Sequence, residues 1–134
     1  MSADLRVTVR RTGDRHTVLT LTGALDFRTA DALYEQVSAA MADCRHLVLD
    51  LSEVAFCDSS GLSTLLRLLR HAESSDVTLA LAAVPAQMAR LLAITGAHAV
   101  FSLHASLPEA LAAGDEAAHD GRPSSGARGG EATT

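Results

Sequence analysis

The sequence contains no lysine and no tryptophan, and its 134 residues include one tyrosine and three phenylalanines. Proteins that hold nucleic acid stack bases on aromatic rings or follow the phosphate backbone with a basic stripe. Here the formal net charge is −5, with 16 acidic residues against 11 arginines, and the arginines form no stripe along the sequence. These deficits argue against direct binding to DNA or RNA.

Cysteines and long apolar runs are also scarce. Cys44 and Cys57 form no Cys-x-x-Cys pair, and the six scattered histidines give no spacing typical of a metal site. We expect both cysteines to be small hydrophobic residues in a reducing compartment. No stretch approaches the roughly 18 apolar residues that span a bilayer, and no signal peptide is recognisable. We therefore expect a cytoplasmic protein without metal, cofactor or membrane contact.

What the chain has in quantity is aliphatic residues, which dominate a hydrophobic content of 48%. Residues 5–10 and 17–23 alternate apolar and polar side chains, and the glycine-containing connection between them indicates an antiparallel hairpin. Residues 46–52 and 77–84 are nearly continuous apolar runs, typical of strands covered on both faces. Residues 99–103 indicate a short last strand.

Four segments show helical features. Residues 29–44 carry one apolar stripe, and Asp26 or Thr29 is expected to cap its start. The second helix is expected to bury Leu62, Leu65, Leu66 and Leu69, spaced at i, i+3, i+4 and i+7. Pro85 is expected as the first residue of the third helix, which Gly96 ends. A last helix begins at residue 107.

The order of these elements is ββαβαβαβα, which predicts a single α/β domain over residues 1–113. Its sheet is expected to be mixed, with parallel later strands and helices packed against it. Residues 114–134 lack apolar periodicity and are predicted to be a disordered tail. In such sheets functional groups gather at the carboxyl ends of the strands. The loops beginning at Asp26 and Asp58 both fall there.

The turn Asp58-Ser59-Ser60-Gly61 leaves two explanations for its serines open. Either Ser59 or Ser60 caps the following helix, or one of them is an exposed phosphate acceptor at a helix start, where N–H groups and the helix dipole favour negative charge. Catalysis is poorly supported. Cys57 stands where a serine-hydrolase elbow needs glycine, the turn lacks the lysine and spacing of a P-loop, and no apolar cleft is evident around Asp26 and Asp58. We therefore expect that the protein is not an enzyme.

Three stretches carry a family resemblance: LTGALDFRTADAL (21–33), LVLDLSEVAFCDSSGLSTLLRLLR (47–70) and MARLLAITGAHAVF (88–101). In order and spacing they resemble the STAS domain family, and most of all its bacterial anti-sigma factor antagonists. The resemblance covers residues 5–113. Its most specific element is the apolar strand followed by x-Asp-Ser-Ser-Gly-Leu.

The resemblance implies a binding module whose partner is an anti-sigma factor that is also a serine kinase of the histidine-kinase-like ATPase type. The kinase would phosphorylate the serine after the aspartate, which matches Ser59, and so end the binding. A serine phosphatase would reverse the modification. The positions that match the family's partner-contacting loops are Asp26, Asp58, Ser60, Gly61 and Leu62. The alternative is a STAS module of another assembly, such as a stress-sensing complex or a transport-linked system, with or without phosphorylation.

Overall fold

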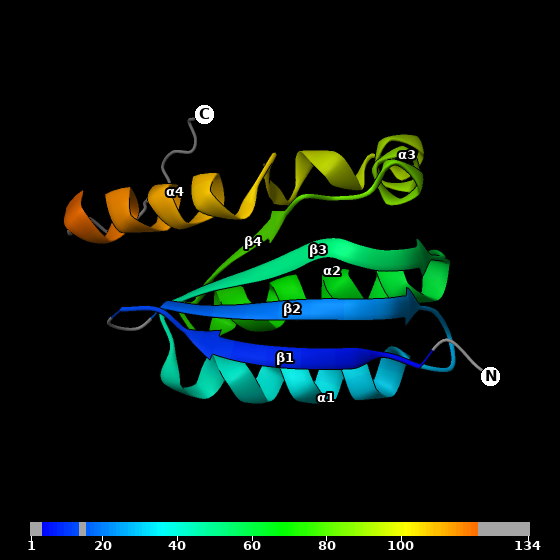
Figure 1. Cartoon of the computed structure of the whole chain (residues 1–134), viewed down its shortest axis with the longest axis horizontal. Helices are drawn as coiled ribbons and strands as arrows, with labels where there is room; N and C mark the ends of the chain where they lie inside the picture. The colour runs from blue at the N-terminus through cyan, green and yellow to red at the C-terminus, as the bar shows by residue number, and fades with distance from the viewer. Residues whose placement is uncertain (1–3, 14–15, 121–134) are drawn as a thin grey trace.

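The structure, a computed structural model, describes residues 4–13 and 16–120, with side chains described as far as Gly114. Five strands form one sheet in the order β1-β2-β3-β4-β5 (Figure 1). The strands are β1 (Arg6–Arg11), β2 (His16–Leu25), β3 (His46–Cys57), β4 (Thr78–Ala82) and β5 (Ser102–His104). The helices are α1 (Ala30–Ala40), α2 (Ser59–Ser74), α3 (Ala86–Thr95) and α4 (Leu107–Asp120), with 3-10 turns η1 (Met41–Asp43) and η2 (Ala97–Ala99).

The sheet is mixed, as the sequence predicts. β1 pairs with β2 antiparallel, and β2, β3, β4 and β5 pair in parallel. The predicted order ββαβαβαβα is confirmed. Because β2 and β3 are parallel neighbours with Leu25 opposite Cys57, the two loops that follow these residues begin side by side.

Two apolar clusters hold the layers together. The larger one joins the sheet to the helices α1 and α2, which Figure 1 shows behind β1, β2 and β3, and includes Met88 and Leu92 of α3. The smaller one lies on the opposite face, where Ala110 of α4 packs on Val18, Val48 and Ala80. β4 and the first half of β3 are thus covered on both faces, which explains their continuous apolar sequences.

Several element ends differ from the sequence prediction. Pro85 is the N-cap of α3, with an extended ψ of 161°, and not its first helical residue. Residues 97–99 form η2, so β5 begins only at Ser102. The predicted end of the domain at residue 113 falls inside α4, which continues to Asp120. The rest of the predicted tail, residues 121–134, lies outside the described residues.

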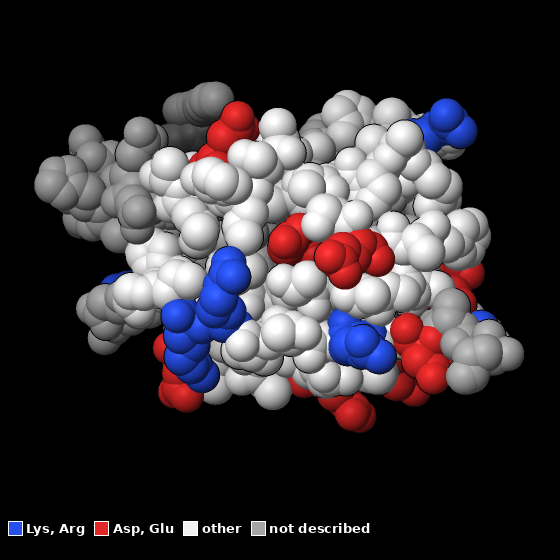
Figure 2. All heavy atoms as spheres, viewed as in Figure 1, with Lys and Arg blue, Asp and Glu red and all other residues white. Residues whose placement is uncertain are grey.

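Charges on the exposed face of the sheet are few and of both signs (Figure 2). Figure 2 shows separate basic and acidic patches divided by uncharged surface, and the described residues form no continuous basic stripe on this face. None of the helices in the described part of the chain is long and apolar enough to cross a membrane.

Gly61 sets the distance between α2 and β2, and Gly61→Ala tests this contact. An added Cβ would collide with the backbone carbonyl oxygen of Leu25 and lie 2.7 Å from the Leu25 Cβ. We expect Gly61→Ala to lower the free energy of unfolding in urea by about 3 kcal/mol, since backbone atoms cannot yield as a flexible side chain can. Gly114→Ala is the control, because its added Cβ would meet only ordinary contacts. Equal stability of the two variants would contradict this packing.

Candidate functional site

Asp58 caps the helix α2. Its backbone is extended, with φ −108° and ψ −171°, and its Oδ1 accepts hydrogen bonds from the N–H groups of Ser60 at 2.9 Å and Gly61 at 3.1 Å. A carboxylate at this position satisfies two N–H groups that have no partner within the helix and complements the helix dipole. The interpretation of Ser59 or Ser60 as the cap is therefore wrong.

Ser59 is the first residue of α2, and its side chain is exposed. Ser63 lies one turn further along the helix and is also exposed, whereas Ser60 is half-buried. The N–H groups of Ser60 and Gly61 already donate to Asp58. A negatively charged group added at Ser59 would therefore not be drawn into the helix end, but would stand outside it beside a carboxylate.

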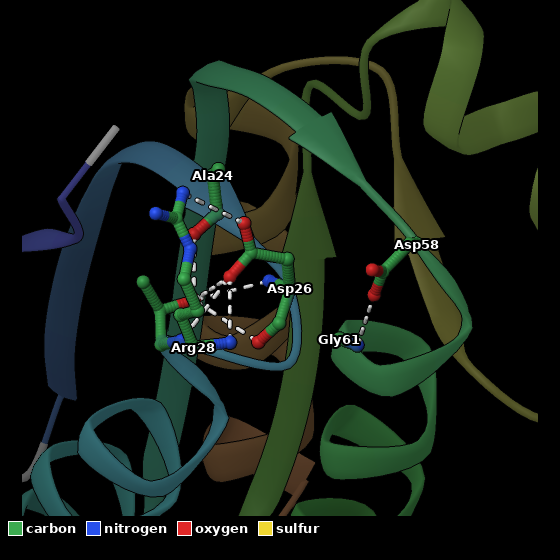
Figure 3. Close-up of polar contacts among 6 residues, drawn as sticks. Ala24, Asp26, Arg28, Asp58 and Gly61 are labelled. Carbon is green, nitrogen blue, oxygen red and sulfur yellow. Dashed lines mark hydrogen bonds and ion pairs between the residues drawn. The ribbon is translucent and has the colours of Figure 1, made fainter. Parts of the chain in front are cut away.

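The loop after β2 is held by a small network around Asp26 (Figure 3). Oδ1 of Asp26 accepts from the N–H groups of Arg28 at 2.9 Å and Thr29 at 3.2 Å. The Arg28 guanidinium lies 3.8 Å from Oδ2 of the same carboxylate. The Thr29 hydroxyl donates to the carbonyl oxygen of Ala24 at 2.8 Å and accepts from the Asp26 N–H at 3.0 Å. These bonds fix the direction in which the loop leaves the sheet.

Thr29 is the residue that stands at the N-cap position of α1, although its side chain makes no capping bond there. Of the two predicted caps, Thr29 thus occupies the N-cap position but does not cap the helix with its side chain. Asp26 instead closes a turn on the N–H groups of Arg28 and Thr29. This turn leaves Phe27 directed outward, with 77% of its surface exposed.

The loops that carry Asp26 and Asp58 are joined at their start. The N–H of Asp58 donates to the carbonyl oxygen of Leu25 at 3.1 Å, and Leu25 pairs with Cys57. Asp26 and Asp58 therefore follow directly paired residues at the carboxyl edge of the sheet. Phe27, Asp26, Asp58 and Ser59 form what we call the acceptor edge.

Two residues that the resemblance placed among the partner contacts are buried. Leu62 is 5% exposed and belongs to the main core, and Gly61 packs against Leu25. Both residues thus leave little of their surface exposed. Both residues seat the helix that carries Ser59, and their contact with a partner stays a prediction.

Cys57, directly before Asp58, is a buried free thiol. Burial raises the pKa of this thiol to about 12, and the nearby Asp58 carboxylate adds to the increase. The neutral thiol is a poor nucleophile. Cys57 is thus the buried hydrophobic residue that the sequence predicts, whereas Cys44 is only half-buried.

One residue of this region was not found from the sequence. Gln87, in the first turn of α3, accepts from the N–H of Cys57 and donates to its carbonyl oxygen. No motif marks this glutamine, which comes 30 residues after its partner. Among the described residues there is no group of three or more His, Cys, Asp or Glu side chains that could hold a metal ion.

The comparisons with known proteins agree with this geometry. The family model of the STAS domain matches residues 7–110, which include the acceptor edge and all five strands except Arg6, the first residue of β1. The chain belongs to the STAS domain family. An anti-sigma F factor antagonist of Paenibacillus polymyxa is 29% identical over 96 residues, which are 70% of this chain and 82% of that protein.

Solved STAS structures resemble the chain along most of its length. An anti-sigma factor antagonist from Mycobacterium paratuberculosis superposes with a TM-score of 0.74 at 30% identity, over 84% of this chain and 97% of that one. The antagonist SpoIIAA in its unphosphorylated form superposes with a TM-score of 0.67 at 18% identity, over 79% and 93%. Phosphorylated SpoIIAA of Bacillus gives 0.63 at 19%, over 79% and 96%. At these lower identities the likeness shows the fold.

Replacing Asp58 tests the assignment of the helix cap. We expect Asp58→Ala to lower the free energy of unfolding in urea by about 1–2 kcal/mol, because two N–H groups of α2 lose their acceptor. Ser59→Ala is the matched control at the next position, and we expect a change within about 0.5 kcal/mol, as for an exposed side chain. If Ser59→Ala were the more destabilising of the two, the serine would be the cap.

Proposed function

We propose that this protein is an anti-sigma factor antagonist that acts in the cytoplasm. Its unmodified form binds, through the acceptor edge, an anti-sigma factor that is also a serine kinase, and so releases a sigma factor for transcription. The kinase phosphorylates Ser59, which ends the binding, and a serine phosphatase restores the unmodified form. The protein is then a substrate and a binding module, and it catalyses no reaction itself.

The exposure of Ser59 is the observation that carries this proposal. A protein kinase needs an accessible hydroxyl, and Ser59 offers one at the first position of α2. Because Asp58 supplies the helix cap, modification of the Ser59 hydroxyl would not remove that cap. The name and overall likeness of the Paenibacillus and Mycobacterium antagonists support the choice of partner class.

Electrostatics explain how one phosphate reverses the binding. A phosphoserine carries about −1.5 to −2 charges at neutral pH. At Ser59 this charge is added beside the carboxylate of Asp58. Oδ1 of that carboxylate already accepts hydrogen bonds from the N–H groups of Ser60 and Gly61. On a partner surface that fits a neutral hydroxyl, desolvation of the new dianion and repulsion from nearby groups would both weaken binding. A tenfold loss of affinity needs only about 1.4 kcal/mol.

Phe27 supplies the apolar contact that such a docking surface needs. It is 77% exposed, on the loop whose backbone Asp26 and Thr29 fix. Aromatic side chains held outward on a rigid loop are frequent binding hot spots. We expect Phe27 to insert into the partner next to the first turn of α2.

Phosphorylation of Ser59 can be mapped directly. The protein is incubated with ATP and the candidate kinase encoded closest to its own gene, and the modified residue is located by mass spectrometry. We expect phosphate on Ser59, and none after Ser59→Ala. Ser60→Ala and Ser63→Ala are the matched controls and should remain substrates. Phosphate on Ser60 or Ser63, with Ser59 unmodified, would contradict the proposal.

The charge effect is tested by Ser59→Asp. We expect this variant to bind the unmodified protein's partner at least about tenfold more weakly in calorimetry, because a carboxylate imitates part of the phosphate charge. Its melting temperature should stay within about 2 °C of the wild-type value, since the site is exposed. Unfolding of Ser59→Asp would show that the serine is structural.

Phe27→Ala tests the apolar part of the docking surface. We expect the affinity for the partner to fall by about tenfold or more, as on removal of a hot-spot aromatic ring, with little change in stability. Val9→Ala is the control, because Val9 is 54% exposed and pairs with Leu19, far back along β2 from the acceptor edge. Equal effects of the two substitutions on binding would remove Phe27 from the interface.

A further inference from the structure

Two hydrogen bonds join α3 to the strand that leads into the acceptor turn. The N–H of Cys57 donates to Oε1 of Gln87 at 3.0 Å, and Nε2 of Gln87 donates to the carbonyl oxygen of Cys57 at 2.8 Å. One carboxamide thus binds both polar backbone groups of the residue before Asp58. A two-point contact of this kind fixes the orientation of the backbone as well as its position.

These bonds lie on the side of β3 where β4 no longer offers a partner. β3 pairs with β4 only as far as Asp50, opposite Ala82, but β3 continues to Cys57. Backbone groups at a buried position need a hydrogen-bond partner. At Cys57 the side chain of Gln87 takes the place of a β4 residue.

The acceptor turn is therefore held from two sides. On the β2 side, the N–H of Asp58 donates to the carbonyl oxygen of Leu25 at 3.1 Å. On the α3 side, Gln87 holds the preceding residue. The direction in which the chain leaves β3 decides whether the Asp58 carboxylate reaches the N–H groups of Ser60 and Gly61.

The chemistry of this contact admits few replacements for glutamine. The Gln87 side chain is exposed, so packing does not hold it, and it gives up rotamer freedom to make both bonds. Methionine has a similar length but neither a strong donor nor a strong acceptor. Asparagine has both groups on a stem that is one methylene shorter.

We propose that Gln87 is a positioning residue for Ser59, which orients the Cys57 backbone so that Asp58 caps α2 and the Ser59 hydroxyl faces the kinase. α3 is then a second support of the acceptor turn, beside β2, and Gln87 acts without touching the partner. The kinetic consequence depends on the proposed function, whereas the structural consequence does not.

The structural consequence is measured by amide hydrogen exchange of the full chain in NMR spectra. We expect Gln87→Met and Gln87→Asn to speed exchange of the Cys57 amide by about tenfold, as on loss of one hydrogen bond, and to speed exchange of the Ser60 and Gly61 amides too. Gln36→Met, at an exposed glutamine of α1, is the matched control and should change none of these amides. Wild-type exchange at Cys57 in Gln87→Met would overturn the proposal.

The kinetic consequence is measured with the kinase that phosphorylates Ser59. We expect Gln87→Met and Gln87→Asn to lower kcat by about tenfold, because the hydroxyl is less often in line for transfer, with KM changed much less. Gln36→Met should behave as the wild-type protein does. Unchanged kcat in Gln87→Met despite faster exchange at Cys57 would overturn the positioning role, and so would wild-type kcat in Gln87→Asn.

The two measurements also separate this proposal from the proposed function. If the wild-type protein receives no phosphate at Ser59, the proposed function fails. Hydrogen exchange then decides the role of Gln87 alone: faster exchange at Ser60 and Gly61 in Gln87→Met supports its control of the turn, and unchanged exchange contradicts it.

Discussion

The capping of α2 by Asp58 is the interaction on which the acceptor edge depends. Its Oδ1 holds the N–H groups of Ser60 and Gly61, so the helix begins at Ser59 and the Ser59 hydroxyl is left outside the cap. Had a serine been the cap, phosphorylation would have competed with the start of the helix. A carboxylate in this place separates the two tasks, because one residue begins the helix and its neighbour is open to modification.

The packing beneath the acceptor edge gives this arrangement its rigidity. Gly61 lets α2 approach Leu25, and Leu62 anchors the same turn in the core. The carbonyl oxygen of Leu25 in turn accepts a hydrogen bond from the N–H of Asp58, and Gln87 holds Cys57 from the other side. Under the proposed function, a phosphate on this turn would change the charge of the surface, and the packing beneath it would keep the fold the same.

Much of the fold follows from the sequence because its elements differ strongly in pattern. The alternating hairpin strands, the continuous apolar runs of β3 and β4 and the glycine after α3 all lie where the patterns place them. The buried face of α2 was harder to assign. Its many leucines allow more than one stripe, and the structure buries Leu68 more deeply than Leu66 or Leu69, since the direction of the helix over the sheet decides among them.

The candidate site was predictable in position but not in detail. Parallel strands bring the loops of Asp26 and Asp58 to one edge, which the order of elements is enough to predict. The choice of cap among Asp58, Ser59 and Ser60 was not predictable, because all three residue types cap helices well and only the backbone direction at the end of β3 selects one. Gln87 is beyond local patterns altogether, since its role arises where β4 ends before β3 does.

The central claim is that a phosphate on Ser59 changes the binding surface and leaves the fold intact. It is tested most directly by calorimetric titration of the anti-sigma partner with two forms of the protein, one unmodified and one carrying phosphoserine at position 59. The account predicts a folded phosphoprotein that binds at least about tenfold more weakly than the unmodified form. Equal affinities of two folded forms would contradict it.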